Sequence, residues 1–213
     1  MYLEYCNYNR IIDDYTKELT LIFKAMEHDI KGICVPIHFA KEIRQIIPEG
    51  FVLASPIDYP SGYSSTKEKY FSALNYLRSG INAIDYVSNQ FLLYNRFSDL
   101  EKEIQTILNM CVDYGATFRG FLDYKYMTDV SRISSLTKIY NNLGVNIAYP
   151  SLGYHHEDFS DTIINCKMIE EQTKISTIFN GYIWKKEQRD IVIKSGIFGM
   201  RIYDINFWCN IKK

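Results

Sequence analysis

The chain has 213 residues, of which 47% are hydrophobic, so it is long and apolar enough to bury one substantial core, and a single domain over residues 1–213 is expected. Its formal net charge is −1, with acidic and basic residues mixed along the chain, so no basic surface for nucleic acid or an anionic membrane is expected. No run of about 18 apolar residues occurs, which argues against a membrane-spanning helix.

Apolar periodicity and turn residues divide the chain into alternating strands and helices. Short apolar runs predict strands over residues 3–8, 32–36, 51–55, 82–87, 118–122, 146–149, 175–179 and 198–203. Helical spacing of apolar residues, with Ser, Thr or Asp caps and Gly or Pro stops, predicts helices over residues 13–28, 39–47, 66–80, 100–114, 128–144, 159–171 and 185–194.

This alternation predicts a compact (β/α)₈ barrel in the α/β class, because each strand is followed by enough residues for a helical crossover. An open, doubly wound sheet is the alternative, since the same alternation permits it. In a barrel, residues 143–153 form a helix end, a glycine turn, a buried strand and a loop of small residues. That loop would lie on the C-terminal face, where barrel enzymes place their chemistry.

Six segments follow in order along nearly the whole chain, at residues 3–6, 33–36, 59–62, 80–87, 119–123 and 143–153, and together they resemble the deoxyribose-phosphate aldolase family. The stretch L-G-V-N-I-A-Y-P-S-L-G at residues 143–153 is similar to the family's sixth strand, A-G-A-D-F-V-K-T-S-T-G. The resemblance implies a (β/α)₈ barrel, but function does not follow automatically from a fold.

The two catalytic lysines of this class I aldolase family are replaced. The family's Schiff-base lysine falls on Tyr149, and the second lysine, which lowers the pKa of the first, falls on Thr177 if Gly181 matches the family's last glycine. Neither side chain can form an imine. Lys125, just after the fifth predicted strand, is the one lysine that we consider as a replacement.

Polar residues nonetheless remain at the positions that the resemblance places in the barrel mouth. Asp85 matches the family's proton-relay aspartate, Arg119 replaces a lysine, and Asp123 replaces a glutamate. Asp85 and Arg119 either serve a substrate or form an internal salt bridge. Tyr149 is either a general acid or a ring that fills the space of the imine. Asn89 and Ser151 share strand faces with these residues.

The family's phosphate site, built from backbone N–H groups, is only partly matched. The resemblance places its Gly-Gly turn at Asn180 and Gly181, and its Gly-x-Ser turn has no counterpart in residues 200–204. Arg201 either compensates as a positive charge or is a solvated residue at a strand end. The substrate-binding candidates are therefore Arg119, Asn89, Ser151, Thr177, Asn180 and Gly181.

No metal or cofactor is expected. Adjacent His155 and His156 cannot easily chelate one ion together, so a metal there would need outside ligands such as Asp123, and no cysteine pair has zinc spacing. The five scattered cysteines and the absence of a signal-peptide pattern predict reduced, buried thiols in a cytoplasmic protein. The many tyrosines are compatible with a homo-oligomer.

Two functions follow from these residues. The first is an enzyme that acts on a small anionic, sugar-like compound by acid–base chemistry of the lyase or isomerase type, with Asp85, Asp123 and Tyr149 as catalytic residues and Arg119 holding the anion. It predicts that Asp85→Asn leaves folding intact and abolishes turnover. The second is an inactive barrel that binds a ligand or a partner protein, which predicts a mouth plugged by Tyr149, Phe179 and Tyr203.

Overall fold

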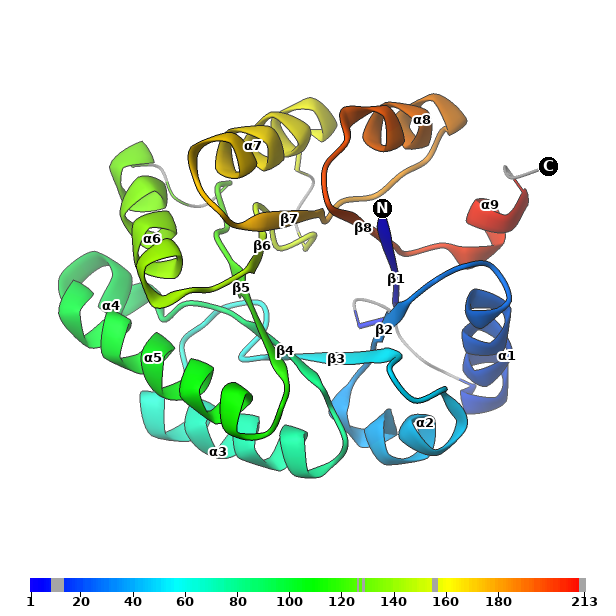
Figure 1. Cartoon of the computed structure of the whole chain (residues 1–213), viewed down its shortest axis with the longest axis horizontal. Helices are drawn as coiled ribbons and strands as arrows, with labels where there is room; N and C mark the ends of the chain where they lie inside the picture. Colours follow the sequence, from blue (N-terminus) through cyan, green and yellow to red (C-terminus); the bar gives the residue numbers. More distant parts are fainter. Residues whose placement is uncertain (9–13, 126, 128, 155–156, 211–213) are drawn as a thin grey trace.

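The computed structural model describes residues 1–8, 14–125, 127, 129–154 and 157–210. Eight parallel strands form a closed barrel in sequence order, so the barrel prediction is confirmed and the open sheet is excluded (Figure 1). The strands are β1 (Tyr2–Cys6), β2 (Gly32–Cys34), β3 (Val52–Ile57), β4 (Ala83–Tyr86), β5 (Thr117–Phe121), β6 (Ile147–Tyr149), β7 (Ser176–Phe179) and β8 (Gly199–Ile202).

Helices surround the barrel and follow the strands in the predicted alternation (Figure 1). They are α1 (Tyr15–Met26), the 3₁₀ turn η1 (Ile37–Phe39), α2 (Ala40–Ile46), α3 (Thr66–Arg78), α4 (Gln90–Asn95), α5 (Phe97–Asp113), α6 (Val130–Leu143), α7 (Phe159–Gln172), α8 (Lys186–Ser195) and α9 (Ile205–Asn210). The short helices α4 and α9 were not predicted. Within the described residues, no helix has the length and apolar character needed to cross a membrane.

The helix boundaries follow the capping residues. Ser65 and Glu68 form a reciprocal capping box at the start of α3, and Asp129 and Asp158 cap α6 and α7 with their carboxylates. Gly144 ends α6 at φ +79, a left-handed conformation that glycine adopts without a steric penalty. Thr128, the first residue of the helix predicted over residues 128–144, lies outside the described residues.

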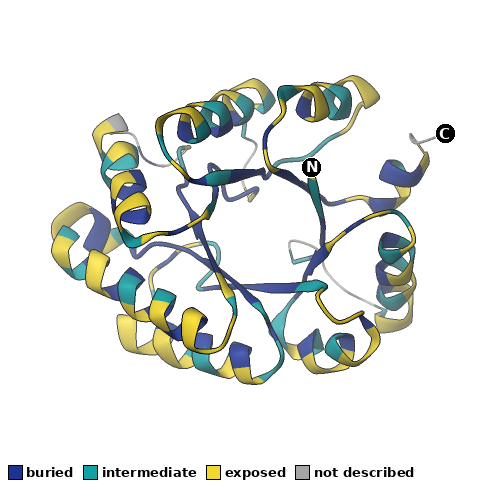
Figure 2. Ribbon diagram, in the orientation of Figure 1, coloured by how far each residue is buried: buried dark blue, intermediate teal, exposed yellow. Residues whose placement is uncertain are grey.

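Two packed regions result from the alternation of side chains along each strand. Outward-facing strand residues such as Ile84 and Tyr86 pack under the helices in the main apolar core. Figure 2 shows the buried strands enclosed by helices whose outer faces are exposed. The barrel interior holds two small apolar clusters, around Cys34 and around Phe121, with charged side chains between them.

Candidate functional site

Four charged side chains from four strands meet inside the barrel: Glu4 of β1, Asp85 of β4, Arg119 of β5 and Arg201 of β8. Arg119 lies 2.5 Å from Glu4 and 2.6 Å from Asp85, and Arg201 lies 2.8 Å from Glu4 and is also paired with Asp85. Each of the four is at most 3% exposed. Two carboxylates and two guanidinium groups thus form a closed, formally neutral network, as a stable buried cluster of charges requires.

The network fixes the charges of Glu4 and Arg119. Burial alone would raise the pKa of Glu4, but the guanidinium groups of Arg119 and Arg201 lower it to about 2. Burial opposes the positive charge of Arg119, whereas Asp85 and Glu4 raise its pKa well above the ordinary value. Glu4 and Arg119 therefore stay ionised near neutral pH, and Arg119 is held by carboxylates of its own chain.

Tyr149 completes this network as a neutral hydrogen-bonding ring. Its Oη donates to Asp85 over 3.3 Å and accepts from Arg201 over 2.9 Å, and its ring stacks on Phe121 with 4.6 Å between centroids. Tyr149 is fully buried, and burial raises the pKa of its phenol well above the ordinary value. The ring occupies the barrel centre and its hydroxyl is bonded to Asp85 and Arg201 of the same chain, which favours the space-filling interpretation.

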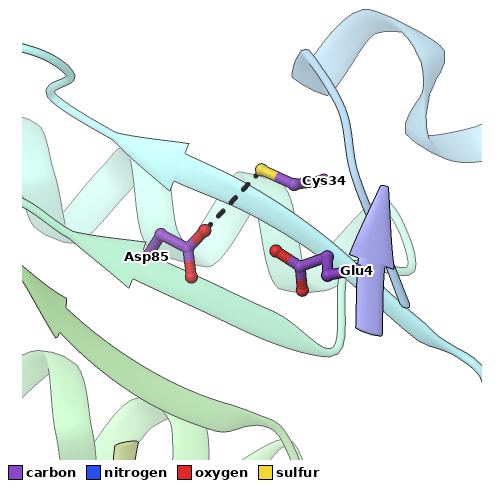
Figure 3. Close-up of side chains that lie close together, drawn as sticks. All are labelled: Glu4, Cys34 and Asp85. Atoms are coloured by element: carbon purple, nitrogen blue, oxygen red, sulfur yellow. Dashed lines mark hydrogen bonds between the residues drawn. The ribbon is translucent and has the colours of Figure 1, made fainter. Parts of the chain in front are cut away.

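Three of these interior groups lie close enough to suggest a metal site. Figure 3 shows Glu4, Asp85 and Cys34 pointing toward one another, with the Cys34 thiol 3.6 Å from the Asp85 carboxylate. One ligand atom from each lies within 4.8 Å of the others. Both carboxylates are already paired with guanidinium groups, however, so a cation would have to compete with Arg119 and Arg201. This donor set does not fit a cation well. His155 and His156 lie outside the described residues.

At the ends of β6, β7 and β8, the polar groups bind one another. The Ser151 hydroxyl donates to the Asn180 carbonyl over 2.5 Å, the Asn180 amide donates to the Ser151 carbonyl over 2.9 Å, and Tyr203 donates to the Asn180 side chain over 2.5 Å. Ser151, Asn180 and Tyr203 are buried, while the adjacent Gly181 is partly exposed. The structure therefore brings Ser151, Asn180 and Gly181 together, with the first two tied to each other.

The side chains of strand β7 face the opposite sides of the barrel wall from those predicted. The Thr177 hydroxyl and backbone N–H both donate to Glu170 of α7, over 2.9 and 2.8 Å, and Phe179 packs on Phe159 of α7. Both side chains face the helix layer, so their placement at the barrel mouth was wrong. Strand alternation instead puts Ile178 inside, in the cluster with Phe121 and Tyr149. Of the three residues predicted to plug the barrel mouth, only Tyr149 and Tyr203 remain candidates for that role.

Two further candidates have structural partners. Asn89 caps α4, where its side chain accepts from the Leu92 N–H over 3.1 Å and donates to the Ser64 carbonyl over 2.9 Å. Arg201 is 3% exposed, so of the two alternatives for this residue the solvated strand end was wrong. Besides its place in the network, Arg201 lines a cavity of 360 Å³ beside α9 and Trp184.

Asp123 is separate from this network and lines an open cavity of 580 Å³ on the C-terminal face. It is 5% exposed, and its Oδ1 is buried with no hydrogen-bond partner in the described part of the chain. Burial, and then the charge of Glu157, raise its carboxyl pKa to about 7. The cavity is lined by Asp123, Leu152 and Tyr154, by the turn residues Pro60, Ser61 and Tyr63, and by Gln90, Phe91, Tyr94 and Asn95 of α4.

The cavity wall contains residues that the sequence did not suggest as functional. Helix α4 was not predicted, so Phe91 and Tyr94 had no assigned place. A signal was available for Tyr63, which follows the Tyr-Pro-Ser-Gly turn already noted at residues 59–62. Asp123 itself adopts φ +48, a left-handed conformation uncommon for residues other than glycine and associated with functional sites.

The fold and this site define a (β/α)₈ barrel with a filled, charge-paired centre and an acidic side cavity. No protein-family model matches the chain. The chain is similar to the deoxyribose-phosphate aldolase of Streptococcus agalactiae, with 24% identity over 159 residues, 73% of this chain and 70% of the relative. The resemblance to the deoxyribose-phosphate aldolase family is thereby confirmed.

Solved structures agree in fold. The tetrameric deoxyribose-phosphate aldolase of Aeropyrum pernix superposes with a TM-score of 0.79 at 17% identity, covering 94% of this chain and 86% of that one. An aldolase named QR15 gives a TM-score of 0.80 at 17% identity, covering 94% of this chain and 88% of that one. At this identity the likeness concerns the aldolase barrel fold, and the chemistry has to be argued from the residues.

Proposed function

We propose that this aldolase-like barrel transfers protons on a small, sugar-like carbonyl compound in the cavity at Asp123, without a Schiff base. The observation that carries the proposal is the Asp123 carboxyl, which is buried at a cavity wall with its pKa raised to about 7. A group with a pKa near the working pH can both accept and return a proton efficiently.

Two lysines, Lys69 and Lys125, were considered as the nucleophile of an imine, and neither has a suitable position. Lys69 is 1% exposed, but it lies on α3 outside the barrel, where it donates to the Val87 carbonyl over 2.8 Å and pairs with Glu103 at 3.1 Å and Asp58 at 3.5 Å. Lys125 is exposed, whereas an imine-forming lysine is activated by desolvation in an apolar pocket or by a neighbouring cation.

The proposed step is a proton transfer at the carbon next to a carbonyl group. The Asp123 carboxylate takes the proton from that carbon, whose C–H electron pair moves into the adjacent bond as the carbonyl becomes an enolate. The carboxylic acid then returns the proton to carbon. Asp85 and Tyr149 do not line the cavity of Asp123, so their part in this proposal is to hold the barrel centre together.

Solvent deuterium exchange tests this function. The protein would be incubated in deuterated water with small aldoses and ketoses, each with and without phosphate, and deuterium at carbon would be followed by proton NMR. We expect exchange with the native chain and with Asp113→Asn, an exposed aspartate at the end of α5, and loss of exchange with Asp123→Asn. Exchange that is unchanged in Asp123→Asn would overturn the assignment.

Imine formation is tested separately by borohydride reduction in the presence of deoxyribose 5-phosphate, followed by intact mass measurement. We expect no adduct, while an active class I aldolase beside it is trapped. A reduced adduct on this chain would mean that a lysine, Lys125 included, has taken over the nucleophile role, and the proton-transfer proposal without an imine would be withdrawn.

The neutral network and Tyr149 also favour a second function, an inactive barrel that binds a ligand or a partner protein. Absence of exchange with all compounds, together with measurable binding, would support it. A cytoplasmic location with reduced thiols belongs to either proposal, and all five cysteines are buried. A homo-oligomer is also part of the proposal, prompted by the tetrameric Aeropyrum pernix structure, and light scattering tests it.

A further inference from the structure

We infer that the cavity at Asp123 selects an uncharged sugar, bound as a ring that is in equilibrium with its open carbonyl form, and disfavours its phosphorylated form. This inference rests on the proposed function, because it names the substrate class of the same cavity. It differs from the sequence expectation of an anionic substrate held by Arg119, since Arg119 is 1% exposed and paired with Glu4 and Asp85.

The first reason is the aromatic wall of the cavity. Tyr63, Phe91, Tyr94 and Tyr154 are 74, 59, 38 and 57% exposed, yet all four line one cavity of 580 Å³. That volume is in the range of small-molecule sites, roughly 300–1,000 Å³. The C–H faces of a sugar ring stack on aromatic rings, and such stacking would remove exposed apolar surface from water.

The second reason is the set of polar groups beside these rings. Ser61, Gln90, Asn95 and Asp123 line the same cavity and offer hydroxyl, amide and carboxyl groups. Hydroxyl groups on a ligand can both donate and accept, so they suit a mixed set of donors and acceptors. The buried Asp123 Oδ1, which has no hydrogen-bond partner among the described residues, provides an acceptor that a ligand hydroxyl could satisfy after a small rearrangement.

The third reason is the sign of the local charge. The described residues that line the cavity include no lysine or arginine. Arg132 lies behind the wall, with its guanidinium 5.8 Å from the Tyr94 ring centre and bonded to the Leu93 carbonyl over 3.3 Å. Burial, and then the charge of Glu157, raise the carboxyl pKa of Asp123. The negative charge of Glu157 therefore acts at the cavity and opposes a second negative group.

A backbone donor near the cavity is also occupied by the chain's own carboxylate. The N–H of Gly153, next to the lining residues Leu152 and Tyr154, donates to Glu157 over 3.0 Å. Backbone N–H groups of glycine turns are common phosphate ligands. Glu157 therefore takes a position that a phosphate oxygen would need, and an uncharged ligand does not compete for it.

The test compares matched pairs of compounds by saturation-transfer NMR and by titration of intrinsic fluorescence. The pairs are deoxyribose with deoxyribose 5-phosphate and glucose with glucose 6-phosphate, and tetramethylammonium is the cationic probe. We expect at least one uncharged sugar to bind about tenfold or more tightly than its phosphate, a difference of roughly 1.4 kcal/mol. Tighter binding of the phosphates, binding of tetramethylammonium only, or binding of no probe would overturn the inference.

Variants locate the binding. Tyr63→Ala and Tyr154→Ala should each weaken sugar binding about tenfold, because each removes one stacking ring. Tyr114→Ala, an exposed tyrosine at the end of α5 that does not line the cavity, is the matched control and should bind as the native chain does. Equal binding by all three variants would place the sugar elsewhere and overturn the inference.

The outcomes separate this inference from the proposed function. Sugar binding without deuterium exchange in the native chain would leave the inference standing and remove the catalytic role of Asp123. Exchange that depends on Asp123 but occurs only with phosphorylated compounds would leave the proposed function standing and overturn the inference.

Discussion

Replacing Asp85 by asparagine tests whether the barrel centre is a structural network. Asp85 accepts hydrogen bonds from Arg119, Arg201 and Tyr149, and it is fully buried. Asp85→Asn leaves two arginines facing the single carboxylate of Glu4. Breaking a buried charge pair by removing one partner costs about 3–5 kcal/mol, so we expect a loss of that size in the free energy of unfolding. The sequence expectation that Asp85→Asn leaves folding intact is therefore replaced.

Urea unfolding followed by circular dichroism measures this loss, and in a chain of this size the melting temperature should fall by roughly 6–20 °C. Asp113→Asn, an exposed aspartate, is the control and should change stability by less than about 0.5 kcal/mol. The double variant with Arg201→Met should lose less than the sum of the two single variants, because it removes the surplus positive charge. A loss below about 1 kcal/mol in Asp85→Asn would refute the reasoning.

The remaining predictions concern pH and packing. Asp123 has its pKa raised from 3.8 to about 7, so the stability that its protonated carboxyl contributes is present at low pH and is lost as pH rises through about 7. Asp123→Asn should therefore stabilise the protein at pH 8 by up to roughly 4 kcal/mol and have no such effect at pH 3. Urea titrations at both pH values measure this difference. Glu4 has its pKa lowered from 4.5 to about 2, so its contribution is present above pH 4.5 and is lost as pH falls toward 2; Glu4→Gln should flatten acid unfolding in this window. Tyr149→Lys should destabilise the protein, because the added amine lies beside Arg119 and Arg201. It should form no borohydride-trapped adduct, because position 149 is fully buried and closed to a carbonyl compound; a trapped adduct would contradict this. Gly120→Ala should cost about 1–3 kcal/mol in thermal melts, since the added Cβ would lie 2.3 Å from the Tyr140 ring; a neutral result would show that the ring moves aside.

Alternation and turn residues were sufficient to predict the order of strands and the closed barrel, because each element is specified locally. Alternation also made a salt bridge between Asp85 and Arg119 one of the two alternatives for these residues, and the structure shows it, with Arg119 Nε 2.6 Å from the Asp85 carboxylate. The other half of the network was not predicted. Glu4 and Arg201 are 197 positions apart, and they meet because β1 and β8 are neighbours in the closed barrel. Such a contact depends on register across the barrel, which local patterns do not contain.

The errors on β7 and at the cavity have similar causes. Placing Thr177 by matching a glycine four residues later ignored the alternation that turns Ile178 inward and Thr177 toward Glu170. Helix α4 has six residues and no strong apolar periodicity, so the residues that bring Phe91 to the cavity were treated as a loop. The raised pKa of Asp123 depends on burial and on Glu157, and neither follows from the residue type.

The central claim is that Asp123 is a carboxyl group poised to exchange a proton near neutral pH. Carbon-13 NMR titration of the aspartate carboxyl groups, assigned with Asp123→Asn, measures this directly and needs no substrate. We predict a midpoint of about 7 for Asp123, and a lower midpoint in Glu157→Gln because the neighbouring negative charge is removed. A midpoint near the ordinary value of 3.8 would contradict the account and leave the barrel without its proposed acid–base group.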